Sequence, residues 1–420
     1  MTAIKSNQVI NEFFNNADDF LNARYELYKT AGIKSSYDDD RIILNTVYKS
    51  RRSPNDMQRE ANGLILRRLG DNHYTPLVIP PRALRYNINT KQSNEYLSQG
   101  LYKIYYSQDG TSFNMYYFND KWIISSANGF EMNDIKWNKK TYTELIAECL
   151  NNINMTWATF TTQLNINCCY SFMFKHKDIH KFNPDEHLSM WFIQSVNTNQ
   201  QDPEYCIVNL ENPFQDIKSF KEYSGEVVDL PQLYKAAKRA IYDMFDDAME
   251  GEPYIKPVYG FILRSSDESI TGEHSDLYIE SSLSKYIRKF LYNNYVLKYV
   301  DKYKWDRETA ICLSAFLSNT SADFILLFKQ YNKTFESFIS RINLIVNYIC
   351  DKAESEPNPQ YAEEYDNEIK KSADMLYMLY TTDYKYKLGN NRQKNIEHVN
   401  NFVYDKCSLP YLIEAMHIVN

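Results

Sequence analysis

The sequence predicts an α+β fold in which antiparallel sheets are followed by an all-helical C-terminal domain. Short runs rich in β-branched and aromatic residues, separated by turn residues, recur through the first two thirds of the chain, whereas beyond them apolar residues recur at helical spacing. At roughly 100 to 200 residues per domain, 420 residues suffice for two or three domains. We expect an N-terminal helical segment at 1–40, a sheet-bearing domain at 41–290 and a helical domain at 291–420.

Composition limits where the protein acts. No run of about 18 apolar residues could span a bilayer, and the N-terminus lacks a basic region followed by an apolar run, so we expect neither membrane insertion nor a secretory signal. Seven cysteines form no disulfide framework and no metal-type CxxC pair. An intracellular, cytoplasmic location follows. The 36 tyrosines and only 11 glycines, with abundant Asn, Ile and Lys, indicate an A+T-rich genome, typical of many large DNA viruses, so we also consider association with a virion.

The N-terminal elements follow from residue spacing. Apolar and aromatic residues at helical spacing predict one or two helices in residues 1–30, and Gly32 to Asp40 ends them. Six strands should follow, with the sequences RIILNTVY, GLILRRLG, TPLVIPP, GLYKIYY, FNMYYF and KWIISS.

The stretch from Tyr105 to Gly129 is predicted to be two strands joined by a tight turn. The turn is the tetrad Ser107-Gln108-Asp109-Gly110, because Asp-Gly is the strongest short hairpin signal and aromatic runs flank it. A turn requires Asp109 and Gly110 whether or not the protein is an enzyme.

The middle of the chain alternates helices and strands. We predict a helix over 141–161, strands over 168–175, 189–196 and 205–208, a helix over 231–250 and strands over 258–264 and 277–281. Pro231 at the start of the second helix and Gly251 after its end fit helix-boundary chemistry.

An apolar seam marks the helical C-terminal domain. From Phe324 to Ile349, apolar residues recur at alternating spacings of four and three. We interpret the seam as the buried face of a core helix; a partner-binding coiled coil is the alternative. The acidic stretch Glu354 to Glu368, with two prolines, should be an exposed loop.

An ordered series of motifs resembles the covalent nucleotidyltransferase superfamily and, within it, the tRNA-repairing RNA ligases of tailed phages. It covers residues from about 50 to 290. The motifs, in chain order, are EANG at 60–63, PPRALRYNIN at 80–89, the predicted hairpin at 105–129, CYSFMFKHKDIHKF at 169–182, VYGFILRSS at 258–266 and LYIESSLSKYIRKFL at 277–291.

The resemblance implies a nucleotide pocket whose chemistry has been lost. In such ligases a lysine in a Lys-x-Asp-Gly motif attacks the α-phosphate of ATP, but here Ser107 stands at that position, and Gln108 offers no general base to activate it. The other positions expected to carry charge are also changed. The degenerate pocket comprises Glu60, Asn62, Ser107, Asp109, Gly110, Asn128, Met173, Tyr259, Gly260, Tyr278 and Glu280.

We therefore predict a catalytically inactive RNA-ligase-like protein that acts as a structural or assembly component, without cofactor. Its partners would be proteins, in a homo-oligomer or a viral assembly. The alternative is an active ligase that uses ATP and Mg²⁺ through a relocated lysine, for which Lys175 and Lys177 are the candidates.

Passive RNA binding is a separate hypothesis. Arginines concentrate in the first quarter of the chain with tyrosines between them, and this combination can hold phosphates and stack bases. The candidates are Arg51, Arg52, Arg67, Arg68 and Arg85. A solvated sheet surface would show the same composition, and a net charge of −7 argues against a protein that coats nucleic acid along its whole surface.

His176 and His180, four residues apart, raise the question of a metal site. No neighbouring cysteine or carboxylate completes a convincing ligand set in the sequence. We expect a surface turn with incidental histidines and no metal.

Overall fold

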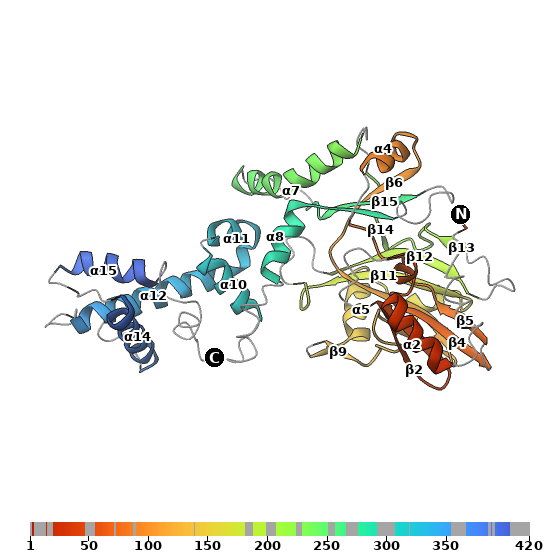
Figure 1. The fold of residues 1–420 in the computed structure, drawn as a ribbon, viewed down its shortest axis with the longest axis horizontal. Helices are drawn as coiled ribbons and strands as arrows, with labels where there is room; N and C mark the ends of the chain where they lie inside the picture. The colour runs from red at the N-terminus through yellow and green to blue at the C-terminus, as the bar shows by residue number, and fades with distance from the viewer. Residues whose placement is uncertain are drawn as a thin grey trace. The chain divides into compact units, whose positions relative to one another are not determined.

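The computed structural model describes residues 2–3, 14, 20–46, 55–70, 73–86, 90–137, 139–180, 188–198, 207–223, 229–250, 257–265, 276–291, 307–318, 320–353, 367–384, 388 and 391–403. The chain forms two compact units: Met1–Asp243 with Ile255–Lys285, and Met244–Tyr254 with Tyr286–Asn420. Sheets occupy the first unit and helices the second, so the predicted α+β class is confirmed (Figure 1). Residues 1–40, expected as a separate segment, belong to the first unit.

A large sheet forms the centre of the first unit. Its strand order is β1 (Thr2–Ala3), β13 (Ile207–Asn209), β12 (Leu188–Asn197), β11 (Cys168–His176), β7 (Thr111–Phe118) and β8 (Lys121–Ser125), and the short β14 (Lys218–Ser219) pairs in parallel with β12. Strands β7 and β8 form a hairpin whose turn residues Asn119 and Asp120 have φ of 49° and 60°. Two consecutive positive φ angles characterise a type I′ turn, which suits the twist of a hairpin.

A four-stranded N-terminal sheet packs against one face of the large sheet. It consists of β2 (Ile33–Tyr37), β3 (Arg41–Thr46), β4 (Leu64–Gly70) and β5 (His73–Val78), and α2 (Phe20–Ala31) joins its core. The short helix α3 (Asp56–Glu60) precedes β4. Strand β2 lies in the segment from Gly32 to Asp40, where we expected the N-terminal helices to end and predicted no strand. Strand β2 is formed by pairing with β3. Its sequence, IKSSY, lacks the alternation of apolar and polar residues that would predict a strand.

A small sheet carries the tetrad, and here the predicted hairpin is wrong. Strands β6 (Tyr102–Tyr106), β15 (Gly260–Ser265) and β16 (Leu277–Glu280) pair in the order β16-β15-β6, whereas β7 pairs with β8 and β11 in the large sheet. Residues 107–110 therefore carry the chain from one sheet to another. Helices α4 (Thr90–Ser98) and α7 (Leu230–Glu250) contribute to the core on one face of the small sheet.

Helices cover the other face of the large sheet. The helix expected over 141–161 is two helices, α5 (Tyr142–Asn151) and α6 (Trp157–Thr162), because Thr141 and Thr156 each accept a hydrogen bond as an N-cap. Both helices pack into an aromatic core with β7, β11 and β12. The small hairpin of β9 (Lys136–Trp137) and β10 (Lys140–Thr141) precedes α5.

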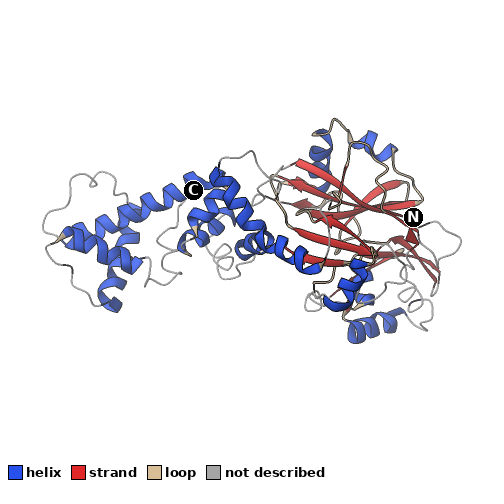
Figure 2. Cartoon of the chain, turned by 90° about the horizontal axis from the view of Figure 1, so that it is seen from above, coloured by secondary structure: helices blue, strands red, loops and turns tan. Residues whose placement is uncertain are grey.

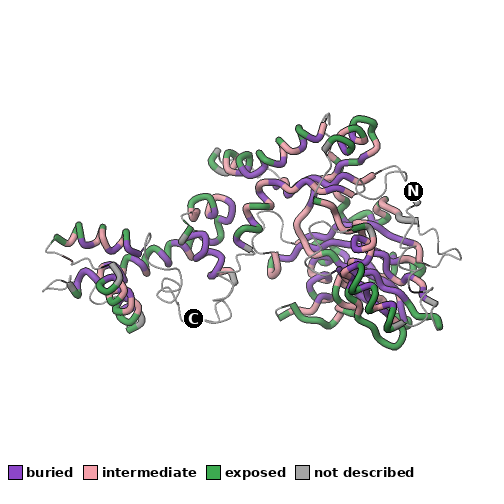
Figure 3. Tube along the Cα trace, in the orientation of Figure 1, coloured by how far each residue is buried: buried purple, intermediate pink, exposed green. Residues whose placement is uncertain are grey.

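The second unit is helical among its described residues (Figure 2). Its elements are α8 (Ser282–Leu291), which begins in the first unit, α10 (Arg307–Leu317), α11 (Ser321–Leu327), η3 (Lys329–Tyr331), α12 (Asn332–Ala353), α14 (Asn367–Leu379), the π-helical turn η4 (Tyr380–Tyr384) and α15 (Arg392–Asn401). Every residue of the predicted seam is buried, which confirms that it is a core face (Figure 3). Residues 354–366 of the predicted acidic loop lie outside the described residues.

Candidate functional site

The candidate site lies where the small sheet faces the large sheet. Alternate side chains of the small sheet, such as Ile104 and Phe261, enter the core with α4 and α7, so Tyr105 and Ile262 point the opposite way. There they line a cavity of about 210 Å³. The other walls come from the large sheet and the chain after β13: Phe192, Ile193, Leu210, Glu211, Asn212, Ser219 and Phe220, and Arg264 of β15 completes the lining.

Ser107 is held by its backbone at the end of β6. Its N–H donates to the carbonyl of Gly260 over 2.8 Å, and only 6 % of the residue is exposed. The hydroxyl of Ser107 lies 3.5 Å from the carbonyl oxygen of Gln108, a long and weak contact. The tetrad therefore continues the small sheet by one residue before the chain crosses to the large sheet.

Met173 fills the space beside the tetrad. It lies in the middle of β11, opposite Ser112 of β7 and Trp191 of β12, and is 5 % exposed. A β-carbon at Gly110 would lie 2.8 Å from Cγ of Met173, so the methionine rests directly on the glycine backbone. Gly110 thus provides room for the Met173 side chain.

Tyr278 fills a matching space on the small sheet. Its hydroxyl donates to the carbonyl of Tyr259 over 3.1 Å, and a β-carbon at Gly260 would lie 2.9 Å from its ring. Gly260 has φ of +151°, a conformation that glycine tolerates far better than other residues. Glu280, two residues after Tyr278 on β16, pairs in register with Gly260.

Lys175 lies in the same group of side chains. It follows Met173 by two residues on β11 and is fully buried. Its Nζ lies 5.2 Å from the ring centre of Tyr259 and 5.5 Å from that of Trp191, within the range of cation–π attraction. Tyr278 contacts Tyr259, and Lys175 lies beside the Tyr259 ring, whereas Ser107 bonds to Gly260 and Met173 rests on Gly110. None of these four predicted residues, nor Lys175, is among the residues that line the cavity.

Three other residues of the predicted pocket, Glu60, Asn62 and Asn128, lie in another part of the first unit. Glu60 forms an ion pair of 2.8 Å with Arg82, and Asn128 accepts a hydrogen bond from the amide of Asn45. Asn62 is half-buried in the loop before Gly63, and a β-carbon at Gly63 would lie 3.0 Å from Cα of Ala127. Because Asn62 adjoins Gly63 and Asn128 adjoins Ala127, these two loops bring the asparagines into one neighbourhood.

The predicted RNA-binding arginines do not form one described patch. Arg51 and Arg52 lie outside the described residues. Arg67 and Arg68 are exposed on β4, and the guanidinium of Arg67 lies 5.5 Å from the ring centre of Phe118. Arg85 is half-buried, and its N–H donates to the carbonyl of Asp276.

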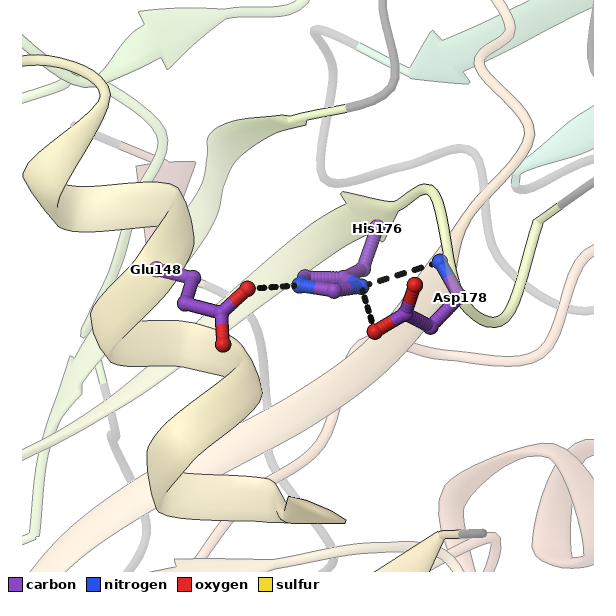
Figure 4. Close-up of side chains that lie close together, drawn as sticks. All are labelled: Glu148, His176 and Asp178. Carbon is purple, nitrogen blue, oxygen red and sulfur yellow. Dashed lines mark hydrogen bonds and ion pairs between the residues drawn. The ribbon is translucent and has the colours of Figure 1, made fainter. Parts of the chain in front are cut away.

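The two histidines do not share a site, and His176 instead lies between two carboxylates (Figure 4). Its Nε2 is 2.9 Å from Glu148, while its Nδ1 accepts a hydrogen bond from the backbone N–H of Asp178. This pattern assigns a neutral imidazole that donates from Nε2. His180 turns away: its Nδ1 accepts from the N–H of His176, and its other ring nitrogen lies 3.1 Å from the Thr111 hydroxyl.

Lys140 already supplies a cation to these carboxylates. Its Nζ lies 2.6 Å from Glu148 and 2.9 Å from Asp178. The hydrogen bonds from Lys140 lower the pKa of both the Glu148 and the Asp178 carboxyl groups. The same hydrogen bonds raise the pKa of Lys140. Ligand atoms of Glu148, His176 and Asp178 all lie within 4.8 Å of one another, close enough to hold a metal ion, and Lys140 pairs with both carboxylates. Neither carboxylate was predicted from the sequence as a partner of His176: Asp178 was passed over although it is two residues away, and Glu148 is distant along the chain.

Comparisons with known proteins place the chain beside viral proteins. No family model matches it. Proteins named "Putative RNA-ligase" from the Pretoriuskop isolate and the Badajoz strain of African swine fever virus are each 25 % identical over 342 residues, covering 76 % of this chain and 73 % of theirs. The chain is related to these viral proteins. The corresponding protein of the Malawi isolate is 24 % identical over 337 residues, covering 74 % and 72 %.

Similar solved structures are ligases too. One titled "Archaeal ATP-dependent RNA ligase - form 2" has a TM-score of 0.40 and 10 % identity, covering 95 % of this chain and 99 % of that one. A "Putative ATP-dependent DNA ligase from Aquifex aeolicus" has a TM-score of 0.36 and 9 % identity, covering 91 % and 98 %. At these scores the likeness carries no weight for function. Among the described residues, no helix is both long and apolar enough to cross a membrane.

Proposed function

We propose that this chain is a catalytically inactive RNA-ligase-like protein that serves as a structural or assembly component of a virus. Its partners would be copies of itself or other proteins, and it would act inside the infected cell or in the virion. One observation carries the proposal: the residues in place of the family's charged pocket residues are packed against one another and against glycines. Met173 rests on Gly110, and Tyr278 rests on Gly260.

The chemistry of Ser107 supports inactivity. Attack on the α-phosphate of ATP requires an activated nucleophile, and a serine hydroxyl needs an adjacent general base. Among the described residues, the hydrogen bond formed by the Ser107 hydroxyl is the long contact to the carbonyl of Gln108, which cannot remove a proton at neutral pH. A serine in this setting would not form a covalent nucleotide adduct.

The size and charge of the site also argue against ATP. The cavity between the sheets has a volume of about 210 Å³, smaller than the roughly 300 to 1,000 Å³ of ordinary ligand pockets, and none of the predicted pocket residues lines it. Glu280 points to the same side of β16 as Tyr278, where the family has lysines that bind phosphates. Its carboxylate would repel a triphosphate. We therefore propose no nucleotide cofactor and no Mg²⁺.

A labelling experiment tests this proposal. The purified full chain is incubated with α-labelled ATP and Mg²⁺, denatured and separated by electrophoresis, with an active RNA ligase as the positive control. No label should remain on the chain. Label that survives denaturation would refute inactivity.

The burial of Lys175 favours a second candidate, an active ligase with a relocated nucleophile. Lys175 lies beside the predicted motif residue Tyr259, and a lysine amine is the nucleophile that such ligases use. Under this alternative the wild type is labelled, and Lys175→Met abolishes the label. Lys177→Met is the matched control, because Lys177 lies two residues further on and is exposed. Equal labelling of the two variants would exclude Lys175.

Exposure of Arg67 and Arg68 leaves passive RNA binding as a further candidate. Two phosphate contacts on single-stranded RNA correspond to a slope of log K against log salt of about −1.4. If RNA binds this face, the double variant Arg67→Gln/Arg68→Gln should reduce the slope by about that amount. The control Lys121→Gln removes an exposed cation on β8. Absence of RNA binding at low salt would eliminate the candidate.

A further inference from the structure

We propose that the exposed face of α7 (Leu230–Glu250) binds the same face of a second copy of this chain, with the two helices antiparallel about a two-fold axis. The inference rests on the proposed function and deepens it, because it names a copy of the chain as a partner and identifies the surface through which the copies associate. None of the residues of the predicted nucleotide pocket lies on α7.

One face of α7 is buried, and the opposite face carries a regular row of exposed side chains (Figure 3). The buried face includes Leu233, Ala237 and Met244. The exposed residues, here called the α7 row, are Lys235, Arg239, Tyr242, Asp246 and Met249. They recur at alternating spacings of four and three, which places them on one stripe of an α-helix, opposite the buried residues. Two helices pack along their length through stripes of this spacing.

The α7 row contains large apolar side chains that face solvent. Tyr242 is 63 % exposed and Met249 is 65 % exposed. Single exposed apolar residues are ordinary on a protein surface. Here, however, the two lie seven residues apart on the same stripe, so a partner helix would contact both. These side chains supply apolar contact area, whereas the charges of the row decide which partner fits.

The charges of α7 are segregated along the helix. Its N-terminal half carries Lys235, Lys238 and Arg239, and its C-terminal half carries Asp243, Asp246 and Asp247. Like charges three or four residues apart repel each other, so each group is unfavourable on the helix alone. The last turn contains no basic residue, although the helix dipole favours cations there. The stability of the helix itself therefore does not explain this order of charges.

A second copy in antiparallel orientation would match each charge with a complementary group. Lys235 and Asp246 lie equally far from one point near the middle of α7, and Arg239 and Tyr242 lie equally far from the same point. In an antiparallel pair centred on that point, Lys235 of each copy faces Asp246 of the other, and Arg239 faces the ring of Tyr242. The first contact is an ion pair and the second a cation–π contact. Because the row is complementary to itself, the partner is a second copy, joined through an isologous interface.

The residues of the expected ion pair are available for it. Lys235 and Asp246 are both exposed, and neither forms an ion pair with any residue in the part of the chain that the structure describes. Arg239 lies 3.3 Å from Asp243 within the same helix, in an exposed pair that leaves its guanidinium accessible. The contact between two copies of Lys235 and Asp246 would therefore replace no existing ion pair.

Charge reversal tests this pairing. The full chain and the variants Lys235→Glu and Asp246→Lys are compared by sedimentation velocity over a range of protein concentrations. The wild type should form a dimer. Each variant should weaken the dimer about tenfold or more, because Lys235→Glu places a carboxylate opposite that of Asp246, and Asp246→Lys places an ammonium group opposite that of Lys235. An equimolar mixture of the two variants should restore the dimer, since both contacts then join opposite charges again.

Lys29→Glu on α2 is the matched control, because it makes the same change of charge at an exposed position of another helix. It should leave the dimer unchanged, and circular dichroism establishes that each variant is folded. A wild type that stays monomeric overturns the inference. So does a dimer that Lys235→Glu and Asp246→Lys weaken no more than the control does, or a mixture of these variants that does not associate.

This failure is distinct from failure of the proposed function. Covalent labelling with ATP decides whether the chain is inactive, and sedimentation decides whether α7 joins two copies. An unlabelled chain that stays monomeric would overturn only the α7 interface, whereas a labelled chain that dimerises through α7 would overturn only the inactivity.

Discussion

The Nζ of Lys175 lies 5.2 Å from the ring centre of Tyr259, although the two residues come from distant motifs of the chain. Lys175 is fully buried beside Tyr259, and its Nζ also lies 5.5 Å from the ring centre of Trp191. The ammonium is therefore within cation–π range of two aromatic rings.

Restoring the lysine of the tetrad should not restore activity. Ser107→Lys returns the missing amine, but Met173, Tyr278 and Glu280 remain, so we expect no label from α-labelled ATP. Ser107 is 6 % exposed, and burying a second ammonium there should lower the free energy of unfolding by about 3 kcal/mol or more. Urea unfolding measures this loss.

Ser107→Met is the matched control for size without charge. Overpacking alone should cost about 1 to 3 kcal/mol, so a larger loss for the lysine variant is due to the charge. Covalent label on Ser107→Lys would show that the site still handles phosphates, contrary to the proposal.

Substitution of Gly260 should be strongly destabilising. An alanine there would place its β-carbon against the carbonyl oxygen of Ile279 and 2.9 Å from the Tyr278 ring, in a backbone conformation with φ of +151°. We expect Gly260→Ala to cost about 2 to 4 kcal/mol in urea unfolding. Gly70→Ala is the control, because a β-carbon at Gly70 meets nothing within 4 Å, and it should change stability by less than about 0.5 kcal/mol. Equal losses for the two variants would contradict the packing described.

The ion pairs of Lys140 with Glu148 and Asp178, here called the Lys140 network, should stabilise the fold only in a window of pH between an acid and an alkaline limit. The hydrogen bonds from Lys140 lower the pKa values of Glu148 and Asp178 below the ordinary values of 4.5 and 3.8, so their contribution is present above those ordinary values and is lost as pH falls. The pKa of Lys140 is raised above 10.5, so its contribution is present below that value and is lost as pH rises.

Thermal unfolding as a function of pH tests this window. The difference in Tm between wild type and Lys140→Met should be largest near neutral pH and shrink on acidification below about pH 4. Lys121→Met is the control, since it breaks a more exposed ion pair with Glu131 and should shift Tm less. A Tm difference that does not change with pH would show that the network adds no electrostatic stability.

The buried seam of α12 makes a prediction for the second unit. Phe338 is fully buried, with its ring centre 5.8 Å from that of Phe316 and 6.1 Å from that of Phe335, so Phe338→Ala should cost about 3 to 5 kcal/mol. The adjacent Ile339 is 46 % exposed, and Ile339→Ala should change stability by less than about 0.5 kcal/mol. Similar effects in urea unfolding would mean that the seam does not form the core.

The site was only partly predictable from the sequence. The motif order proposed Ser107, Met173, Tyr259 and Tyr278 as one group; that grouping stays a prediction, since none of the four is among the residues that line the cavity between the sheets. The same reasoning considered Lys175 only as a substitute nucleophile. Its contacts with Tyr259 and Trp191 were not predicted, because those residues come from other parts of the chain. Glu148 was also missed as a partner of His176, since no spacing rule relates a helix residue to a strand residue that lies beyond another helix.

Local patterns in the sequence predict where most strands and helices lie and that the seam from Phe324 to Ile349 is buried, because alternation and helical spacing are local properties of the chain. Which strands pair is a property of the folded chain and could not be predicted from these patterns. The tetrad shows the difference: Asp109 and Gly110 predict a turn, but β6 pairs with β15 and β7 with β11. Strand pairing depends on hydrogen bonds and packing between distant segments, so the turn that seemed to close a hairpin instead joins two sheets across the candidate site.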